Sequence, residues 1–157
     1  REMNNRKPFD KALYAQNDQK AKDVIAGYYE ALGYLVARNP NKYSADLILL
    51  EKTVDGYYKE IALIEVEIRN SWSSKQWPKN WDYRIAYRKA KYQEQNDLPV
   101  VYHTLNSDCT TFVKFKGLLS EYETIKDSNK FVSDETFYSI QVQDNEDVDQ
   151  IDLTVGF

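Results

Sequence analysis

Two apolar segments joined by a short polar turn constrain the fold of this sequence most strongly. Residues Ser44 to Glu51 contain an almost continuous apolar run, which is typical of a strand covered on both faces. After the turn pair Asp55-Gly56, residues Tyr57 to Ile68 are rich in β-branched and aromatic side chains in partial alternation with polar ones. The pattern predicts a hairpin of two neighbouring antiparallel strands.

The flanking segments predict a mixed α/β fold. Apolar residues at helical spacing predict a helix from Asn17 or Asp18, as N-cap, to Leu32, with Gly33 as C-cap. The buried stripe of this helix is predicted to comprise Ala21, Val24, Ile25, Tyr28 and Leu32. The other predicted elements are a strand at 34–38, a helix at 83–95, paired strands at 98–105 and 111–115, a helix or loop at 117–130 and a strand at 137–142. The order predicts a mixed central β-sheet flanked by helices.

Length and composition predict one domain spanning residues 1–157. With 157 residues, of which 42% are hydrophobic, the chain is long enough for one well-buried core and short for two. We expect this core at about 17–115, with residues 116–157 as a C-terminal elaboration. No apolar run approaches the roughly 18 residues needed to cross a bilayer, so we expect no membrane partner.

Cysteine and histidine are too scarce for several chemistries. The single Cys109 excludes an internal disulfide and a cysteine-based zinc site, and it fits a reducing cytoplasm. The single His103 excludes sites that need two histidines, and its apolar neighbours favour a strand residue over a general base. We therefore expect a cytoplasmic protein, with a bacterial or phage context left open, in which any metal ion is held by oxygen atoms.

Charge is distributed unevenly although the formal net charge is only -4. Between Ile68 and Gln93 there are seven basic residues and one acid, whereas between Asp134 and Asp152 there are seven acids and no base. All three tryptophans fall within the basic segment. Aromatic faces stack on bases while cations hold phosphates, so the segment predicts a nucleic-acid surface; an aromatic mini-core under a long loop is the alternative. The predicted nucleic-acid-binding residues are Trp72, Lys75, Trp77, Lys79, Trp81, Arg84, Arg88 and Lys91.

Three carboxylates are predicted to meet on the hairpin. Glu65 and Glu67 share one face of their strand, about 6.6 Å apart along it, and the hairpin brings Asp46 beside them. An acid in an apolar strand is costly unless it is paired or bound to a metal. Oxygen-rich clusters of this kind suit Mg²⁺ or Mn²⁺, although an exposed amphipathic strand would also explain the two glutamates.

These residues resemble the motif of the PD-(D/E)XK nuclease superfamily, which has a restriction-endonuclease-like fold with an αβββαβ core. The resemblance covers about residues 17–105. It rests on the end of the first helix at 28–36, Ser44-Ala45-Asp46-Leu47-Ile48, and Leu63-Ile64-Glu65-Val66-Glu67-Ile68, and the predicted following helix, Arg84 to Tyr92, also fits the family. By this similarity Asp46 and Glu65 would be metal ligands, together with the carbonyl of Val66.

Two positions depart from the family pattern. Ala45 takes the place of a proline, and Glu67 takes the place of the lysine that orients and helps to deprotonate the attacking water. Glu67 is then expected to act as a ligand or base, and the site to depend more strongly on its metal. Arg84, Arg88 and Lys91 recur at i, i+4 and i+7 of the predicted helix, where a shared basic face could meet the scissile phosphate. The predicted catalytic residues are Asp46, Glu65, Glu67, Arg84 and Arg88, and the predicted metal ligands are Asp46, Glu65, Glu67 and Val66.

The sequence thus predicts a Mg²⁺- or Mn²⁺-dependent nuclease, in the manner of an endonuclease, that hydrolyses phosphodiester bonds with DNA favoured over RNA. A homodimer is compatible with this prediction. One alternative is a non-catalytic module on the same fold that binds nucleic acid or protein. Another is an interaction protein whose acidic C-terminal stretch mimics nucleic acid.

Overall fold

The computed structural model describes residues 11–127 and 135–155 as one mixed α/β arrangement. The helices are α1 (Lys11–Ala31) and α2 (Lys91–Gln95), with short 3-10 helices η2 (Tyr87–Ala90) and η3 (Leu119–Glu121). The strands are β1 (Leu35–Arg38), β2 (Leu47–Lys52), β3 (Tyr58–Ile68), β4 (Tyr83–Ala86), β5 (Val100–Leu105), β6 (Thr111–Phe115), β7 (Thr124–Asp127), β8 (Glu135–Ile140) and β9 (Val148–Asp152).

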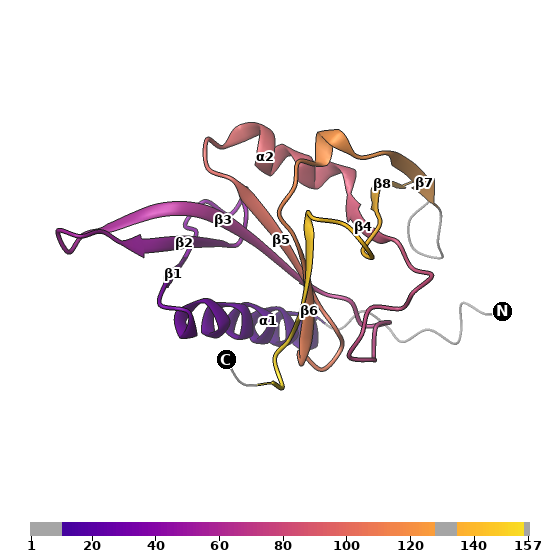
Figure 1. The fold of residues 1–157 in the computed structure, drawn as a ribbon, viewed down its shortest axis with the longest axis horizontal. Helices are drawn as coiled ribbons and strands as arrows, with labels where there is room; N and C mark the ends of the chain where they lie inside the picture. The colour runs from indigo at the N-terminus through magenta and orange to yellow at the C-terminus, as the bar shows by residue number, and fades with distance from the viewer. Residues whose placement is uncertain (1–10, 128–134, 156–157) are drawn as a thin grey trace.

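The elements form three layers (Figure 1). A six-stranded sheet with the order β1-β2-β3-β5-β6-β9 lies in the middle. Helix α1 covers one face of this sheet, and α2 lies on the other side together with the smaller sheet β4-β8-β7. The predicted class, a mixed sheet with helices on its faces, is confirmed at this level.

The predicted hairpin is present and sets the register of the site. β2 and β3 are antiparallel, with Leu47 opposite Ile64, and Gly56 closes the turn at a φ of +91°. Residues without a Cβ adopt such a positive φ most readily, so this position favours glycine. The register places Asp46, which immediately precedes β2, across from Glu65.

β3 and β5 form the parallel pair at the centre of the sheet, with Glu65 beside Tyr102 and Val66 beside His103. Alternation along β3 sends Ile64 and Val66 into the α1 side, where Ile64 is fully buried. Leu63 packs in the opposite core with the tryptophan loop. Burying one such aliphatic side chain contributes about 1.5–3 kcal/mol, so the centre of β3 is strongly fixed on both sides.

The first helix is present, but it differs from the prediction at both ends. Its described part begins at Lys11, so Asn17 and Asp18 lie inside it and are not N-caps. Its fully covered residues are Ala21, Ile25 and Tyr29, whereas Leu32 is 48% exposed beyond its end. Gly33 does terminate the helix: its φ is +100°, its N–H donates to the Glu30 carbonyl, and the Tyr34 N–H donates to the Tyr29 carbonyl.

The predicted helix at 83–95 is wrong for its first half. Tyr83–Ala86 form β4, which pairs with β8 so that Tyr83 lies opposite Ile140. Only Tyr87–Ala90 and Lys91–Gln95 are helical, in two short pieces. A strand partner more than fifty residues away thus overrides the local helical spacing. Arg84, Arg88 and Lys91 therefore do not share one helix face.

The C-terminal third contributes to both sheets. β9 pairs with β6 at the edge of the main sheet, in a segment for which the sequence predicted no structure. β8, at 135–140, matches the strand predicted at 137–142 but begins and ends two residues earlier. The segment predicted as helix or loop contains η3 and the unpredicted strand β7, and residues 128–130 of it lie outside the described part. No helix among the described residues is long and apolar enough to cross a membrane.

Candidate active site

The Asp46 side chain, just before β2, is held by a backbone N–H and by a lysine. Its Oδ2 accepts a hydrogen bond of 2.9 Å from the Val66 N–H, and its Oδ1 lies 3.4 Å from the Lys22 ammonium of α1. Lys22 also pairs with Asp18 one helical turn earlier, at 2.9 Å. Asp46 therefore points toward β3 and is fixed on two sides.

Glu65 lies next to Asp46 and is nearly enclosed, at 8% exposed. Burial raises the pKa of Glu65 to about 8, the positive charge of Lys89 opposes this shift, and the nearby Asp46 adds to it. At neutral pH, with no further cation present, Glu65 therefore retains its proton.

Glu67 lies farther along β3 and is more open, with 46% of its side chain exposed. The Lys89 ammonium lies 2.9 Å from its Oε2 and 3.1 Å from the Glu65 Oε2. One lysine thus bridges both glutamates.

Lys89 is the residue that sequence reasoning missed. It reaches the glutamates from η2, and its carbonyl accepts a 2.7 Å hydrogen bond from the Tyr102 hydroxyl. Burial alone would lower the pKa of Lys89, but Glu67 and Glu65 together raise it above its usual value, so the ammonium stays charged. The absence of a lysine at position 67 was the available signal: a cation had to come from elsewhere, and the basic segment 68–93 was the nearest source.

The three basic residues chosen from the sequence lie elsewhere. Arg84 is tied to Asp82 at 3.1 Å and to Asp127, and Arg88 is 70% exposed at 3.7 Å from Glu135. Lys91 is exposed beside the ring of Tyr92. None of the three forms an ion pair with Asp46, Glu65 or Glu67 in the described part of the chain.

The tryptophan loop is mostly structural. Trp72 and Trp77 are 1% and 2% exposed, and they belong to the core between the two sheets. The alternative of an aromatic mini-core therefore describes these two residues. Trp81 is half-buried, Lys75 donates to the Thr154 hydroxyl, and Lys79 is exposed.

His103 supports the site from the opposite face of the sheet. Its Nδ1 faces the carbonyls of Glu65 and Val101, at 3.3 and 3.2 Å, so Nδ1 carries the proton and Nε2 accepts from the Tyr29 hydroxyl at 2.7 Å. Burial lowers its pKa to about 3, and nearby Lys114 adds to the effect. His103 is thus a neutral residue that joins α1 to the backbone of Glu65.

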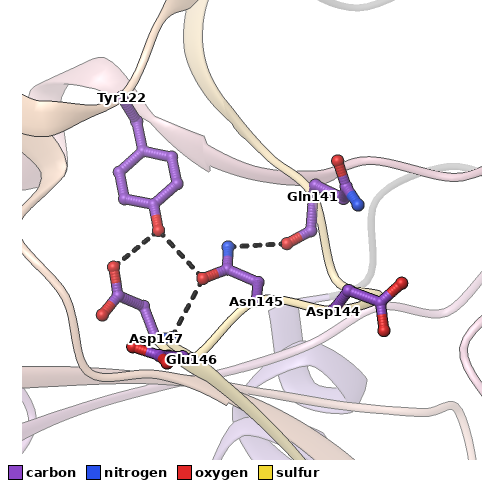
Figure 2. Close-up of a pocket in the computed structure, with 6 residues that line it drawn as sticks. All are labelled: Tyr122, Gln141, Asp144, Asn145, Glu146 and Asp147. Atoms are coloured by element: carbon purple, nitrogen blue, oxygen red, sulfur yellow. Dashed lines mark hydrogen bonds between the residues drawn. The ribbon is translucent and has the colours of Figure 1, made fainter.

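A separate acidic hollow lies at the turn between β8 and β9 (Figure 2). The Tyr122 hydroxyl donates to Asp147 at 2.6 Å and lies 3.2 Å from the Asn145 side-chain oxygen. Asn145 in turn donates to the Gln141 carbonyl at 2.8 Å. These bonds fix the turn internally, and they give Asp147 a hydrogen-bond donor.

No protein-family model matches this sequence, and neither the curated proteins nor the solved structures contain a significant match. The chemistry of the site must therefore be argued from its own residues.

The donor set fits a divalent ion at Asp46 and Glu65. Both side chains offer carboxylate oxygens, and burial, which raises the pKa of Glu65, makes its ionised form costly without a further cation. Among the described residues, however, no three acidic, histidine or cysteine side chains are already grouped around one point. Lys89 is what joins Glu67 to the pair, so the predicted three-carboxylate cage is replaced by two carboxyls plus a lysine-bridged glutamate.

Proposed function

We propose that this protein is a Mg²⁺- or Mn²⁺-dependent nuclease that hydrolyses phosphodiester bonds, with DNA as its favoured substrate. The observation that carries the proposal is the meeting of Asp46 and Glu65 across the hairpin, with Lys89 bridging Glu65 and Glu67. Two acids and a lysine at one point are the groups that such hydrolysis needs. Lys89 supplies from η2 the positive charge that Glu67 cannot supply from β3.

Each side chain then has a separate role. Asp46 and Glu65 would hold the divalent ion, with the Val66 N–H fixing the orientation of Asp46. The ion, when bound, polarises the phosphate and lowers the pKa of a water molecule. Glu67, the most exposed of the three acids, would accept the proton of the attacking water. Lys89 would offset the charge that develops on the phosphate oxygens.

The arrangement of elements supports a restriction-endonuclease-like core for this enzyme. α1, the antiparallel run β1-β2-β3 and the parallel strand β5 follow the αβββαβ order, with β4 inserted before α2. We extend the proposal to a cytoplasmic location, in keeping with the single cysteine, and leave the formation of a homodimer to a size measurement.

Cleavage of supercoiled plasmid and of single-stranded DNA and RNA, with Mg²⁺, Mn²⁺ or EDTA, tests the proposal. We expect Asp46→Asn, Glu65→Gln and Lys89→Met each to lower the rate at least about 100-fold, since each removes a group that acts on the reacting phosphate. Glu60→Gln, on the exposed half of β3, serves as the matched control and should retain wild-type activity. Equal cleavage by all four variants would contradict the assignment.

A second candidate is a non-catalytic binding module. It is favoured by one observation: the Lys89 ammonium already contacts both glutamates without any added ion. This candidate predicts binding without turnover and no rise in melting temperature on addition of Mg²⁺ or Mn²⁺. A metal-dependent rise that Glu65→Gln abolishes would exclude it.

A further inference from the structure

The tryptophan loop builds a fixed aromatic stack beside the carboxylates. The rings of Trp72 and Trp77 are 4.9 Å apart and those of Trp77 and Trp81 are 5.7 Å apart, both edge to face. The indole N–H of Trp72 donates to the Gln76 carbonyl, and that of Trp77 donates to the Trp81 carbonyl. Buried tryptophans with satisfied N–H groups hold their positions well, so Trp81 is presented on a rigid base.

The guanidinium of Arg69 lies over the rings of Trp77 and Trp81. Its Cζ is 4.4 Å from the Trp81 ring centroid and 5.5 Å from that of Trp77, and its Nε donates to the Ser71 hydroxyl at 3.2 Å. Within residues 11–127 and 135–155, Arg69 forms no ion pair, and neither of its terminal nitrogens donates to a protein acceptor. The neighbouring cations differ, since Arg84 is held by two aspartates and Lys89 by two glutamates.

The position of Arg69 relates it to the candidate active site. Its backbone N–H donates to the Leu105 carbonyl at 2.9 Å, which continues the pairing of β3 with β5. Because side chains alternate along an extended chain, Arg69 projects to the same face as Glu65 and Glu67, about 6.6 Å beyond Glu67. Burial lowers the pKa of Arg69, Arg84 adds to this effect, and Asp82 and Glu67 oppose it. The group is therefore a partly desolvated cation whose own charge is not paired.

We propose that Arg69, oriented by Trp81, binds a backbone phosphate of a nucleic-acid strand, next to the phosphate that lies at Asp46 and Glu65. The choice of the neighbouring phosphate rests on the proposed nuclease function. The planar guanidinium can give two parallel hydrogen bonds to phosphate oxygens, and stacking on an indole reduces the freedom it loses on binding. Trp81 is then a positioning residue, while Trp72 and Trp77 support it from within the core.

Binding measured without metal separates this inference from catalysis. Fluorescence anisotropy with labelled single-stranded DNA, RNA of the same sequence and duplex DNA, all in EDTA, gives the affinity and its salt dependence. We expect Arg69→Ala to weaken binding about tenfold and to reduce the slope of log K against log salt by about 1, as for the loss of one phosphate contact. Arg69→Lys should restore the slope but only part of the affinity, because an ammonium does not form the bidentate contact.

Two further variants distinguish a phosphate contact from a structural role. Trp81→Leu should weaken binding less than Arg69→Ala and keep the wild-type slope, since the charge remains while its orientation is lost. Lys59→Ala removes one charge at the other end of the same strand and should leave affinity and slope unchanged. Melting temperatures identify any variant that is unfolded. If Arg69→Ala does not fold, the comparison of Arg69→Lys with the wild-type protein decides the test.

The outcomes are separable. If no nucleic acid binds the wild-type protein, or if Arg69→Ala and Arg69→Lys both match it, the inference is wrong even where cleavage is observed. If polyglutamate competes as well as DNA does, the site recognises acidic peptides and the inference is also wrong. Binding that depends on Arg69 in a protein that cleaves nothing would support the inference and overturn the proposed nuclease.

Discussion

The two halves of β3 each carry a glutamate, and they lie in opposite surroundings. Tyr58, Lys59 and Glu60 are exposed, whereas Ala62 to Val66 are buried. The β2-β3 hairpin extends well beyond α1 and the second sheet, and a register shift between Leu49 and Leu50 separates this arm from the covered half (Figure 1). A glutamate on the exposed arm costs little free energy, whereas a glutamate buried beneath the covering layers needs a nearby cation. The covering layers, and not the strand's own sequence, make Glu65 chemically distinct from Glu60.

The largest expected contrast concerns the lysine that compensates the buried acids. Lys89→Met removes the donor that Glu65 and Glu67 share, and a buried acceptor left without its hydrogen-bond partner costs about 1–3 kcal/mol of unfolding free energy. Lys59→Met on the arm should change it by less than about 0.5 kcal/mol. Urea denaturation at neutral pH in EDTA measures both. Equal effects would mean that the two halves of β3 do not differ electrostatically.

A smaller contrast is expected in the pH dependence of stability. The raised pKa of Glu65 means that the folded state keeps a proton that the unfolded state releases above its usual pKa of 4.5. Its stabilising contribution is therefore complete below about pH 4.5 and is lost as the pH rises toward about 8, by at most about 1.4 kcal/mol per pH unit.

Glu65→Gln should remove this slope from the unfolding free energy of the metal-free protein between those pH values. Glu60→Gln, at the exposed end, should retain it. Denaturation series at several pH values compare the two variants, and a wild-type slope in Glu65→Gln would show that another group is responsible.

The smallest expected effect lies at the tip of the arm. Gly56 has a positive φ and open space around it, so Gly56→Ala should cost about 1 kcal/mol through backbone strain alone and leave cleavage unchanged. Gly27→Ala is the matched control, because Gly27 lies inside α1 with nothing within 4 Å of an added Cβ, and it should stabilise the protein by about 0.5–1 kcal/mol. A loss of cleavage in Gly56→Ala would show that the arm contributes to the reaction.

The parts of the fold that could be predicted are those specified by neighbouring residues. The Asp55-Gly56 turn specifies that β2 and β3 pair as a hairpin, and the register that brings Asp46 to Glu65 also includes the shift between Leu49 and Leu50. Gly33 ends α1 for an equally local reason, its positive φ. Such features depend on a few consecutive residues, so the sequence displays them directly.

The rest depends on partners that are distant in the sequence. Residues 83–86 have helical spacing, but their pairing with β8 makes them a strand, and this change turns Arg84 toward Asp82 and Asp127 and brings Lys89 to the glutamates. The burial of Trp72 and Trp77 likewise comes from a second layer that the sequence does not announce. Lys89 was therefore missed because its position is a property of the whole fold.

The pairing of β4 with β8 also orders events during synthesis. By the time residue 127 has left the ribosome, every charged group of the site is present, yet the strand that aligns β4 has not emerged. The pairing that holds β4, which directly precedes η2, can form only when residues 135–140 become available. The nascent chain thus carries the acids of the site before the strand pairing next to Lys89 can form.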